Sequence, residues 1–207
     1  MFHYDYLSNE KLNQIFYIKP RQINKSIEKK TLAYSLGATL YMPSTRNKIA
    51  EEIINNKNLG VKSIAIDLED AIGDEEVEKA EKSLFQTFES LNSSFHQNLI
   101  NLNNIPFIFI RVRNHDQMIR ISNTIGNCLY LLTGFIFPKF SIKNGGTYLE
   151  ELHNINRKYN LNLYAMPILE TSDIMYLEKR ENTLSGIKEI TDNFYNLILN
   201  IRIGATD

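Results

Sequence analysis

The sequence lacks most of the features that mark several common classes of protein. Its 207 residues include one cysteine, Cys128, so an internal disulfide and a cysteine-based zinc site are excluded. The 23 basic residues nearly balance 24 acidic ones and are scattered, which argues against nucleic acid or an acidic membrane surface as a partner. No apolar run reaches the roughly 18 residues of a membrane-spanning helix, and the first residues do not resemble a signal peptide. We therefore expect a cytoplasmic protein.

Three catalytic signatures are also missing. The four histidines show no zinc-binding spacing, no G-x-S-x-G elbow is present, and no glycine-rich fingerprint follows the first expected strand. Metalloprotease, serine-hydrolase and dinucleotide-binding functions therefore lack their usual signs. What is present is an ordinary globular composition, 43% hydrophobic and 23% charged, which favours a single domain with a normal core.

Short apolar runs recur along the chain, and most are followed by a helical pattern. The expected strands cover residues 38–42, 61–68, 107–112, 134–137, 161–169 and 197–203. The second run is uniformly apolar, which is typical of a parallel strand covered on both faces. A polar linker is expected around residues 92–104. Six βα-type units in one direction imply right-handed crossovers and one parallel sheet.

An open doubly wound sheet and a (β/α)8 TIM barrel both begin in this way. Polar residues follow at least five of the strands, which favours the barrel because a barrel gathers all its strand C-termini around one mouth. A complete barrel needs eight units and roughly 250 residues, so we expect an incomplete barrel of about six βα units over residues 37–207. Residues 1–36 are expected to form an extension that packs its aromatic side chains on the barrel.

Two carboxylates are the strongest candidates for a metal site. Glu170 ends the fifth expected strand and Asp207 the sixth, and neighbouring strands about 4.8 Å apart would bring both side chains to one ion. Carboxylate, water and substrate oxygens suit Mg2+, with Mn2+ next. The pattern is equally compatible with Asp207 as a helix N-cap and Glu170 as a surface acid.

Five further residues are candidates for the mouth. Arg111 would offer a planar fork of donors to a carboxylate or an enolate oxygen, or it could pair structurally with Glu69 or Asp70. Those two acids are consecutive, so at most one should face the mouth directly if the chain is extended. Arg46 could bind an anionic part of a substrate and Lys139 could add positive potential, although both could simply be solvated or paired with neighbours.

The chain resembles the citrate lyase β-subunit and HpcH/HpaI aldolase superfamily in six short motifs, which occur in the same order. The match covers roughly residues 37–207, and the start of the chain, the first strand and the last motif look closest to the TIM-barrel C–C bond lyases of bacterial tellurium-resistance-type operons. The motifs are Leu40–Arg46 (LYMPSTR), Ile66–Ala71 (IDLEDA), Ile110–Val112 (IRV), Phe137–Lys139 (FPK), Pro167–Thr171 (PILET) and Ile203–Asp207 (IGATD).

The resemblance implies a (β/α)8 barrel in which Glu170 and Asp207 hold Mg2+. It also implies that Arg111 binds a carboxylate or enolate oxygen and that Glu69 and Asp70 hold metal-bound water. Three departures stand out. Thr206 stands where the family commonly has glutamate, and Arg113 stands where it commonly has asparagine. Ser44 stands where the first-strand motif usually has glycine, which leaves a CoA-binding role for Arg46 open.

We therefore expect a Mg2+-dependent carbon–carbon lyase or aldolase that acts through a metal-stabilised enolate. Its partner would be a small 2-oxo or β-hydroxy carboxylate or a CoA thioester, and the protein would be a homo-oligomer. The alternative is a barrel that binds a ligand or partner without turnover in a stress-response assembly of the tellurium-resistance type. Screened cleavage of oxo-acid and thioester substrates discriminates between the two.

Overall fold

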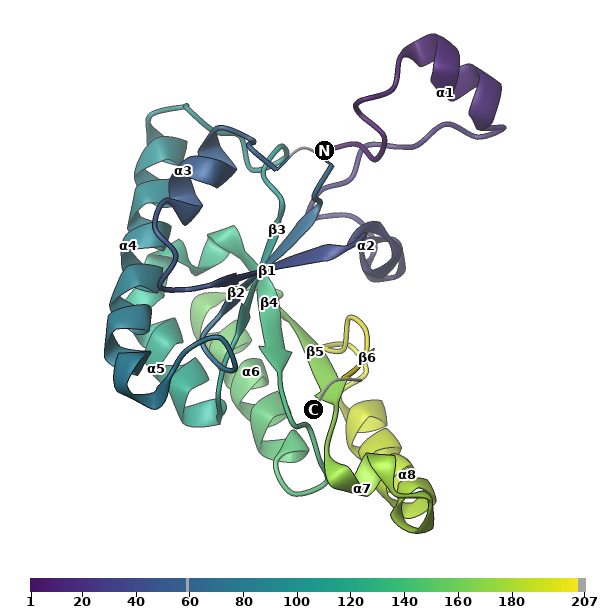
Figure 1. Ribbon diagram of the computed structural model, residues 1–207, viewed down its shortest axis with the longest axis vertical. Coiled ribbons are helices and arrows are strands. Elements are labelled where there is room, and N and C mark those ends of the chain that lie inside the picture. Colours follow the sequence, from purple (N-terminus) through teal and green to yellow (C-terminus); the bar gives the residue numbers. More distant parts are fainter. Residues whose placement is uncertain (59, 205–207) are drawn as a thin grey trace.

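The computed structural model describes residues 1–58 and 60–204. Six parallel strands form one sheet in the order of the sequence, each pairing with the next, and the sheet curls into an incomplete barrel (Figure 1). The predicted fold class, a TIM-type barrel with about six βα units, is confirmed. The strands are β1 Thr39–Pro43, β2 Ser63–Asp67, β3 Phe107–Arg111, β4 Leu132–Phe137, β5 Tyr164–Leu169 and β6 Arg202–Ile203.

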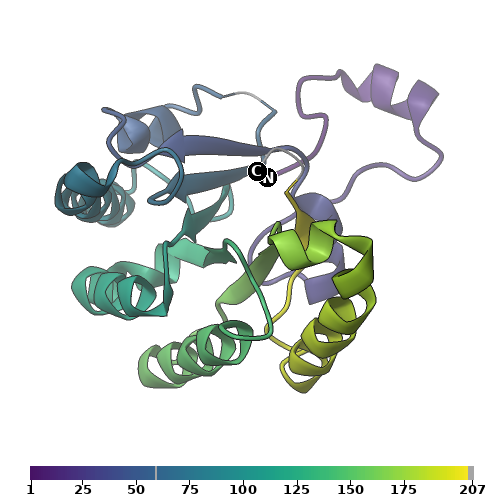
Figure 2. The ribbon, with the colours of Figure 1, turned by 60° about the horizontal axis from the view of Figure 1, so that its bottom comes forward.

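The connecting helices lie side by side along the convex face of the sheet, whereas α2 lies on the concave face (Figure 2). This is the arrangement that right-handed crossovers between parallel strands produce. The helices are α1 Asn9–Ile15, α2 Lys29–Ser35, α3 Ile49–Ile54, α4 Val77–His96, α5 His115–Ile125, α6 Gly145–Tyr159, α7 Ser172–Met175 and α8 Leu177–Asn193, with two 3-10 segments, η1 Asp74–Glu76 and η2 Gly126–Leu131. None of the described helices is long and apolar enough to cross a membrane.

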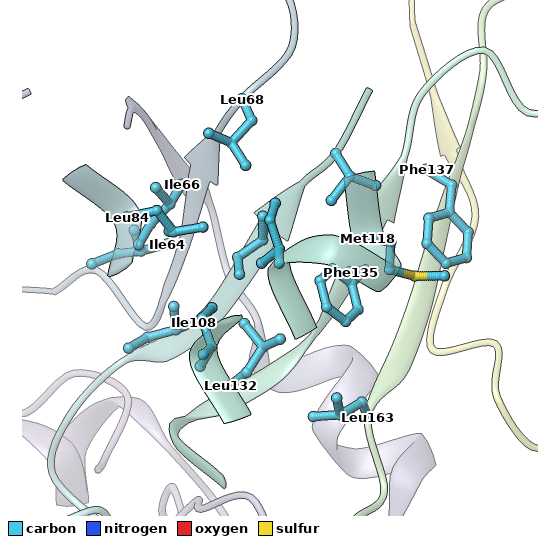
Figure 3. Close-up of a cluster of buried hydrophobic side chains, with 14 of the residues drawn as sticks. Ile64, Ile66, Leu68, Leu84, Ile108, Met118, Leu132, Phe135, Phe137 and Leu163 are labelled. Atoms are coloured by element: carbon cyan, nitrogen blue, oxygen red, sulfur yellow. The ribbon is translucent and has the colours of Figure 1, made fainter. Parts of the chain in front are cut away.

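The larger hydrophobic core fills the space between the sheet and the outer helices (Figure 3). Alternate residues of the central strands, such as Ile64, Ile66 and Ile108, meet Leu84 and Phe88 of α4 there, and all five are at most 1% exposed. Strand side chains alternate between the two faces. The residues between these isoleucines therefore point into the barrel.

A second core lies inside the barrel. Phe107 and Phe109 of β3 and Met166 of β5 pack there with Leu32 and Leu36 from the N-terminal segment. A curled sheet whose inner face is apolar must cover that face. Here α2 and its flanking residues supply the cover, so the inner core depends on residues that precede the first strand.

The N-terminal segment is also tied to the barrel by polar contacts at the beginning of the strands. The Lys25 ammonium donates to the carbonyl oxygens of Tyr130, at 2.6 Å, and Leu132. The aromatic side chains that we expected to hold this segment are largely exposed instead. Tyr6 is 69% exposed and Tyr17 fully exposed, because α1 projects away from the barrel (Figure 1) and buries none of its own residues.

The structure corrects two boundaries. The linker expected from residue 92 begins later, because α4 continues to His96 with Leu91 and Ser94 still on its buried face. The sixth strand, expected over residues 197–203, consists of β6 and one isolated bridge from Ile198 to Ala165. In the first case, the short polar residues after position 92 continue α4 because their spacing keeps its buried face intact.

Candidate functional site

The C-terminal ends of the strands form a mouth that contains two adjoining pockets. Their volumes are about 510 and 450 Å3, and both are lined by Tyr41, Asp70 and Arg111. In a barrel this end of the strands is where the loops gather polar side chains. The pockets therefore lie where the sequence predicted a site.

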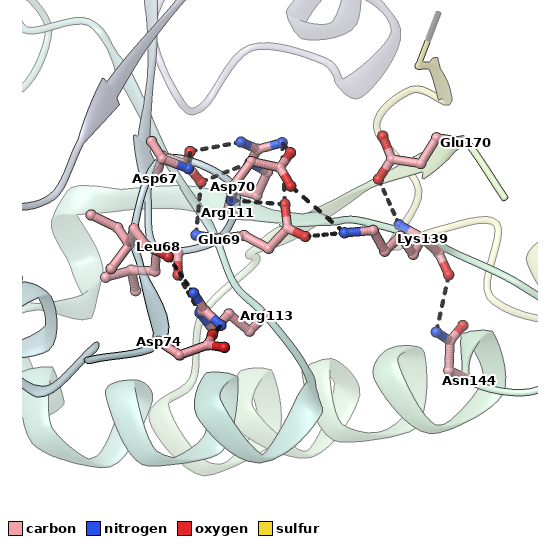
Figure 4. Close-up of polar contacts among 12 residues, drawn as sticks. Asp67, Leu68, Glu69, Asp70, Asp74, Arg111, Arg113, Lys139, Asn144 and Glu170 are labelled. Carbon is pink, nitrogen blue, oxygen red and sulfur yellow. Dashed lines mark hydrogen bonds and ion pairs between the residues drawn. The ribbon is translucent and has the colours of Figure 1, made fainter. Parts of the chain in front are cut away.

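Asp67 and Arg111 form the centre of the polar cluster at this mouth (Figure 4). They end β2 and β3 and lie directly opposite each other in the sheet. Arg111 donates from Nε and Nη2 to the two oxygens of Asp67, at 2.7 and 2.6 Å. The Asp67 carboxylate is 2% exposed, so this two-point contact is strong and directional.

The chain turns immediately after Asp67, and this turn brings both following acids to the same arginine. The backbone N–H groups of Glu69 and Ala71 donate to the Asp67 carboxylate at 3.0 and 3.1 Å. Asp70 then accepts from Arg111 at 2.6 Å, and a Glu69 oxygen lies 3.4 Å from the same guanidinium nitrogen. Because the chain is turned here, the alternation of an extended strand does not separate the two acids. Asp70 lines the pockets, whereas Glu69 is buried.

Lys139 joins this cluster to Glu170. Its ammonium donates to Glu69 at 2.6 Å, and its backbone N–H donates to Glu170 Oε1 at 2.8 Å. The backbone of Lys139 has φ +49°, in the left-handed region that a non-glycine residue seldom occupies. Such conformations cost free energy and are concentrated at functional sites. The turn after β4 is thus held in an unusual conformation, in which Lys139 contacts Glu69 and Asp70 through its ammonium and Glu170 through its backbone.

The charges of the cluster shift the pKa values of its members. Burial raises the pKa of Glu69 against the opposing hydrogen bond from Lys139, and the bond to Glu69 raises the pKa of Lys139. Burial also acts to raise the pKa of Asp70, but the hydrogen bond with Glu69 and the charge of Arg111 outweigh it and lower that pKa. Burial acts to lower the pKa of Arg111, but the hydrogen bonds to Asp67 outweigh this effect and raise that pKa. Glu69 therefore retains its proton more easily than Asp70.

Glu170 follows β5 and lies against the backbone of β6. A Cβ atom added to Gly204 would come within 2.6 Å of both Cβ and Oε2 of Glu170, so only glycine leaves room for the carboxylate there. Asp207, the second predicted metal ligand, lies outside the described residues. Within residues 1–58 and 60–204, no three acidic, histidine or cysteine side chains are grouped as a metal site. The oxygen donors around Glu170 fit a hard cation such as Mg2+ in type.

Two other arginines, Arg46 and Arg113, have different partners. Arg46 is bound to the buried Glu52 by hydrogen bonds of 2.8 and 3.1 Å, and it lines neither of the two pockets described above. Its role in substrate binding stays a prediction. Arg113 donates to the carbonyl oxygen of Leu68 at 3.0 Å and contacts Asp74, so it holds the loop after β2.

Sequence reasoning assigned no individual role to two residues of the mouth. Asp67 belongs to an inward-facing series with Ser63 and Ala65, and the period of two along β2 was the signal that could have revealed it. Tyr41 is likewise two positions beyond the inward-facing Thr39. In both cases the register between strands, which the sequence does not state, decides the neighbour.

A family model for C–C bond lyases of the TIM-barrel fold matches residues 30–207. The chain belongs to this family. No curated protein matches it in sequence. Membership agrees with the six motifs, with the incomplete barrel and with a polar mouth at the C-terminal ends of the strands.

Two solved structures of the malate synthase of Haloferax volcanii are similar to the chain. The match to its lead(II) complex has a TM-score of 0.56 and 14% sequence identity, and it covers 80% of this chain and 49% of the malate synthase chain. The match to its magnesium and glyoxylate complex has a TM-score of 0.49 and 14% sequence identity, and it covers 65% of this chain and 42% of the malate synthase chain. This chain thus spans about half the length of malate synthase, and the first likeness shows a shared fold.

Proposed function

We propose that the chain is part of a Mg2+-dependent carbon–carbon bond lyase or aldolase that acts on a small 2-oxo or β-hydroxy carboxylate or its CoA thioester. The observation that carries the proposal is the polar cluster at the mouth. Four carboxylates, from Asp67, Glu69, Asp70 and Glu170, lie there with three cationic side chains, those of Arg111, Lys139 and Arg202. When all are ionised the formal charge is negative, which favours a divalent cation beside the arginine.

Glu170 and Asp207 would hold the metal in this proposal. The bound ion would polarise the oxygens of a 2-oxo acid and stabilise the negative charge that develops on them. Arg111 would donate to a substrate oxygen from the mouth, where Asp67 fixes the plane of its guanidinium. Asp70 would orient water or substrate, and the buried Glu69 would hold or release a proton, because its pKa is raised.

The finer assignment is also a proposal. The motifs support a place near the citrate lyase β-subunit, in the branch that occurs with tellurium-resistance-type operons. The magnesium and glyoxylate named in the malate synthase complex are ligands of that enzyme. For this chain, the choice of Mg2+ rests on the carboxylate donors of the mouth. The choice of an oxo acid rests on the Arg111 N–H groups that its two-point contact with Asp67 leaves available beside them.

Calorimetric titration with Mg2+ tests the metal assignment. Glu170→Gln should weaken Mg2+ binding by about tenfold or more, because it removes the charge of a ligand. Glu150→Gln is the matched control, since Glu150 is exposed on the outer helix α6, and it should bind Mg2+ like the wild type. Equal affinity in all three proteins would overturn the assignment of Glu170.

A parallel assay tests the chemistry. Small β-hydroxy acids and their CoA thioesters are offered with Mg2+, and release of the carbonyl product is followed. Cleavage that requires Mg2+ and is lost in Glu170→Gln supports the lyase. Background cleavage of every substrate by a protein that still binds Mg2+ would favour a barrel that binds a ligand without turnover.

A further inference from the structure

Arg202 is a second guanidinium at the mouth, and a one-residue bulge in the sixth strand turns it inward. Ile198 lies opposite Ala165, and Arg202 lies opposite Ile168. From Ile198 to Arg202 the chain advances four residues, whereas from Ala165 to Ile168 it advances three. The segment that leads into β6 therefore contains one extra residue. An extra residue inverts the side to which every later side chain points. Arg202 consequently shares the inner face with Ile168 and Met166, which belong to the inner core.

The ring of Tyr41 lies close to both this guanidinium and that of Arg111. The ring centroid is 5.2 Å from the guanidinium carbon of Arg111 and 5.9 Å from that of Arg202. Burial raises the pKa of the Tyr41 phenol although both arginines oppose the shift. The phenol is therefore neutral at ordinary pH, so it does not neutralise either cation.

The two guanidiniums differ sharply in their partners. Arg111 contacts the carboxylates of Asp67, Asp70 and Glu69. Arg202 donates to Thr39 Oγ1 at 2.7 Å. Its other hydrogen bonds to residues that the structure describes are long, with the Tyr41 hydroxyl at 3.4 Å and the sulfur of Met166 at 3.7 Å.

Arg202 therefore carries a charge that the described part of the chain does not neutralise. No carboxylate in residues 1–58 and 60–204 forms an ion pair with it, and its buried Nε has no acceptor there. A partly buried guanidinium is normally paired with an anion. An anionic group of a ligand would supply what the described residues do not.

The pocket beside Arg202 has the size and chemistry for a small acid. It has a volume of about 450 Å3, and its polar lining includes Asp70, Arg111, Glu170 and Arg202. Small-molecule sites fall in this range of volumes. Arg202 thus faces the same cavity as Arg111 and Glu170, to which we assign the reacting end of the substrate.

We propose that Arg202 binds a second carboxylate of the substrate, at the end remote from Arg111 and Glu170, and so selects a small dicarboxylate. This inference rests on the proposed function for the identity of the reacting end. A planar guanidinium can donate two parallel hydrogen bonds to one carboxylate. Tyr41 lies close to both guanidiniums, and all three side chains line one pocket, so a single small acid can reach both arginines.

Malate and lactate make a matched pair of probes, since malate is lactate with one added carboxylate. Binding of each acid is measured by calorimetry with Mg2+ present. The wild type should bind malate about tenfold or more tightly than lactate. Arg202→Gln should bring the two affinities within about threefold by weakening malate alone, and Arg202→Lys should retain part of the preference because it keeps the charge.

Arg120→Gln is the control arginine, because Arg120 is exposed and pairs with Glu81 on the outer helices. It should keep the preference of the wild type. A general loss of structure in Arg202→Gln would weaken both acids in parallel, and this result would overturn the inference. An unchanged preference in Arg202→Gln would also overturn it, as would a wild type that binds neither acid.

The readouts separate this inference from the proposed function. A preference for malate that depends on Arg202, in a protein that cleaves no substrate, would leave Arg202 as an anion-binding residue and refute the lyase. Mg2+-dependent cleavage, together with an unchanged ratio of malate to lactate affinity in Arg202→Gln, would support the lyase and refute the role of Arg202.

Discussion

Asp67 and Arg111 lie opposite each other at the ends of β2 and β3, joined by two nearly equal hydrogen bonds of 2.7 and 2.6 Å. The same carboxylate accepts from the backbone of Glu69 and Ala71. One buried side chain thus fixes both the arginine and the acidic loop beside it. The other acids contact Arg111 from positions that depend on this loop.

Asp67→Asn should destabilise the protein by about 2 kcal/mol, because it weakens charge-assisted bonds to a mostly buried guanidinium. Asp70 and Glu69 would still contact Arg111, so the loss should be smaller than for an isolated buried pair. Urea unfolding measures the change. Asp74→Asn, which alters an exposed partner of Arg113, should leave the free energy of unfolding nearly unchanged. Equal stability of Asp67→Asn and wild type would contradict the central place of this pair.

Gly134→Ala should destabilise the barrel strongly. A Cβ atom at this position in β4 would lie 2.1 Å from the carbonyl oxygen of Tyr164 on the neighbouring strand, and a backbone atom cannot rotate away. A cost of about 3 kcal/mol is expected for such overpacking. Gly146→Ala is the matched control, since nothing lies within 4 Å of its Cβ, and this change in α6 should stabilise by about 0.5 kcal/mol. Urea midpoints that move together in both variants would refute the steric explanation.

Lys25 should make stability depend on pH. Burial lowers its pKa from the ordinary 10.5 to about 7. Between these values the unfolded chain holds a proton on Lys25 that the folded chain has released, so the free energy of unfolding rises with pH by up to about 1.4 kcal/mol per unit. Lys25→Met has no such proton. The stability of the wild type relative to this variant should therefore increase from about pH 7 towards pH 10.

Urea unfolding at several pH values measures this difference. Lys11→Met serves as the control, because Lys11 is exposed on α1, and its difference from the wild type should stay flat. A difference for Lys25→Met that is also flat across the range would show that the buried amine keeps its ordinary pKa. A difference that decreases as the pH rises would mean that the fold stabilises the charged amine.

The sequence was sufficient for the sheet and for much of the mouth. Apolar runs and turn residues located every strand within a few positions, except that most of the sixth expected strand is irregular. The acids at 69 and 70, Arg111 and Lys139 come together because each follows the C-terminal end of a parallel strand, or ends one, and the barrel brings those ends to one mouth. That step needs only the order and direction of the strands.

The details that depend on register could not be predicted. Asp67 pairs with Arg111 because the two strands align residue by residue, and no local pattern states this alignment. The bulge that turns Arg202 inward adds a single residue between Ile198 and β6, which the apolar pattern does not mark. The turn that brings Glu69 and Asp70 to one arginine depends on the hydrogen bonds to Asp67, so an extended chain does not describe it. The expectation that at most one of the two acids faces the mouth is nevertheless met, because only Asp70 lines the pockets.

Gly204→Ala should weaken Mg2+ binding without removing any proposed ligand. The new Cβ would lie 2.6 Å from Cβ and Oε2 of Glu170, so the Glu170 side chain must rotate or β6 must shift. Either movement displaces the carboxylate proposed to bind the metal, and calorimetry should show an affinity about tenfold lower. Stability should change less than in Gly134→Ala, because part of what is displaced is the end of a flexible side chain.

Two controls make the glycine test decisive. Gly73→Ala, with nothing within 4 Å of the new Cβ, lies in the loop near the acidic cluster and should bind Mg2+ like the wild type. In the double variant Gly204→Ala with Glu170→Gln, affinity should fall no further than in Glu170→Gln alone, because both changes act on one carboxylate. Additive losses would mean that Gly204 affects the metal by a route other than Glu170, and wild-type affinity in Gly204→Ala would mean that the close contact with Glu170 is not required for binding.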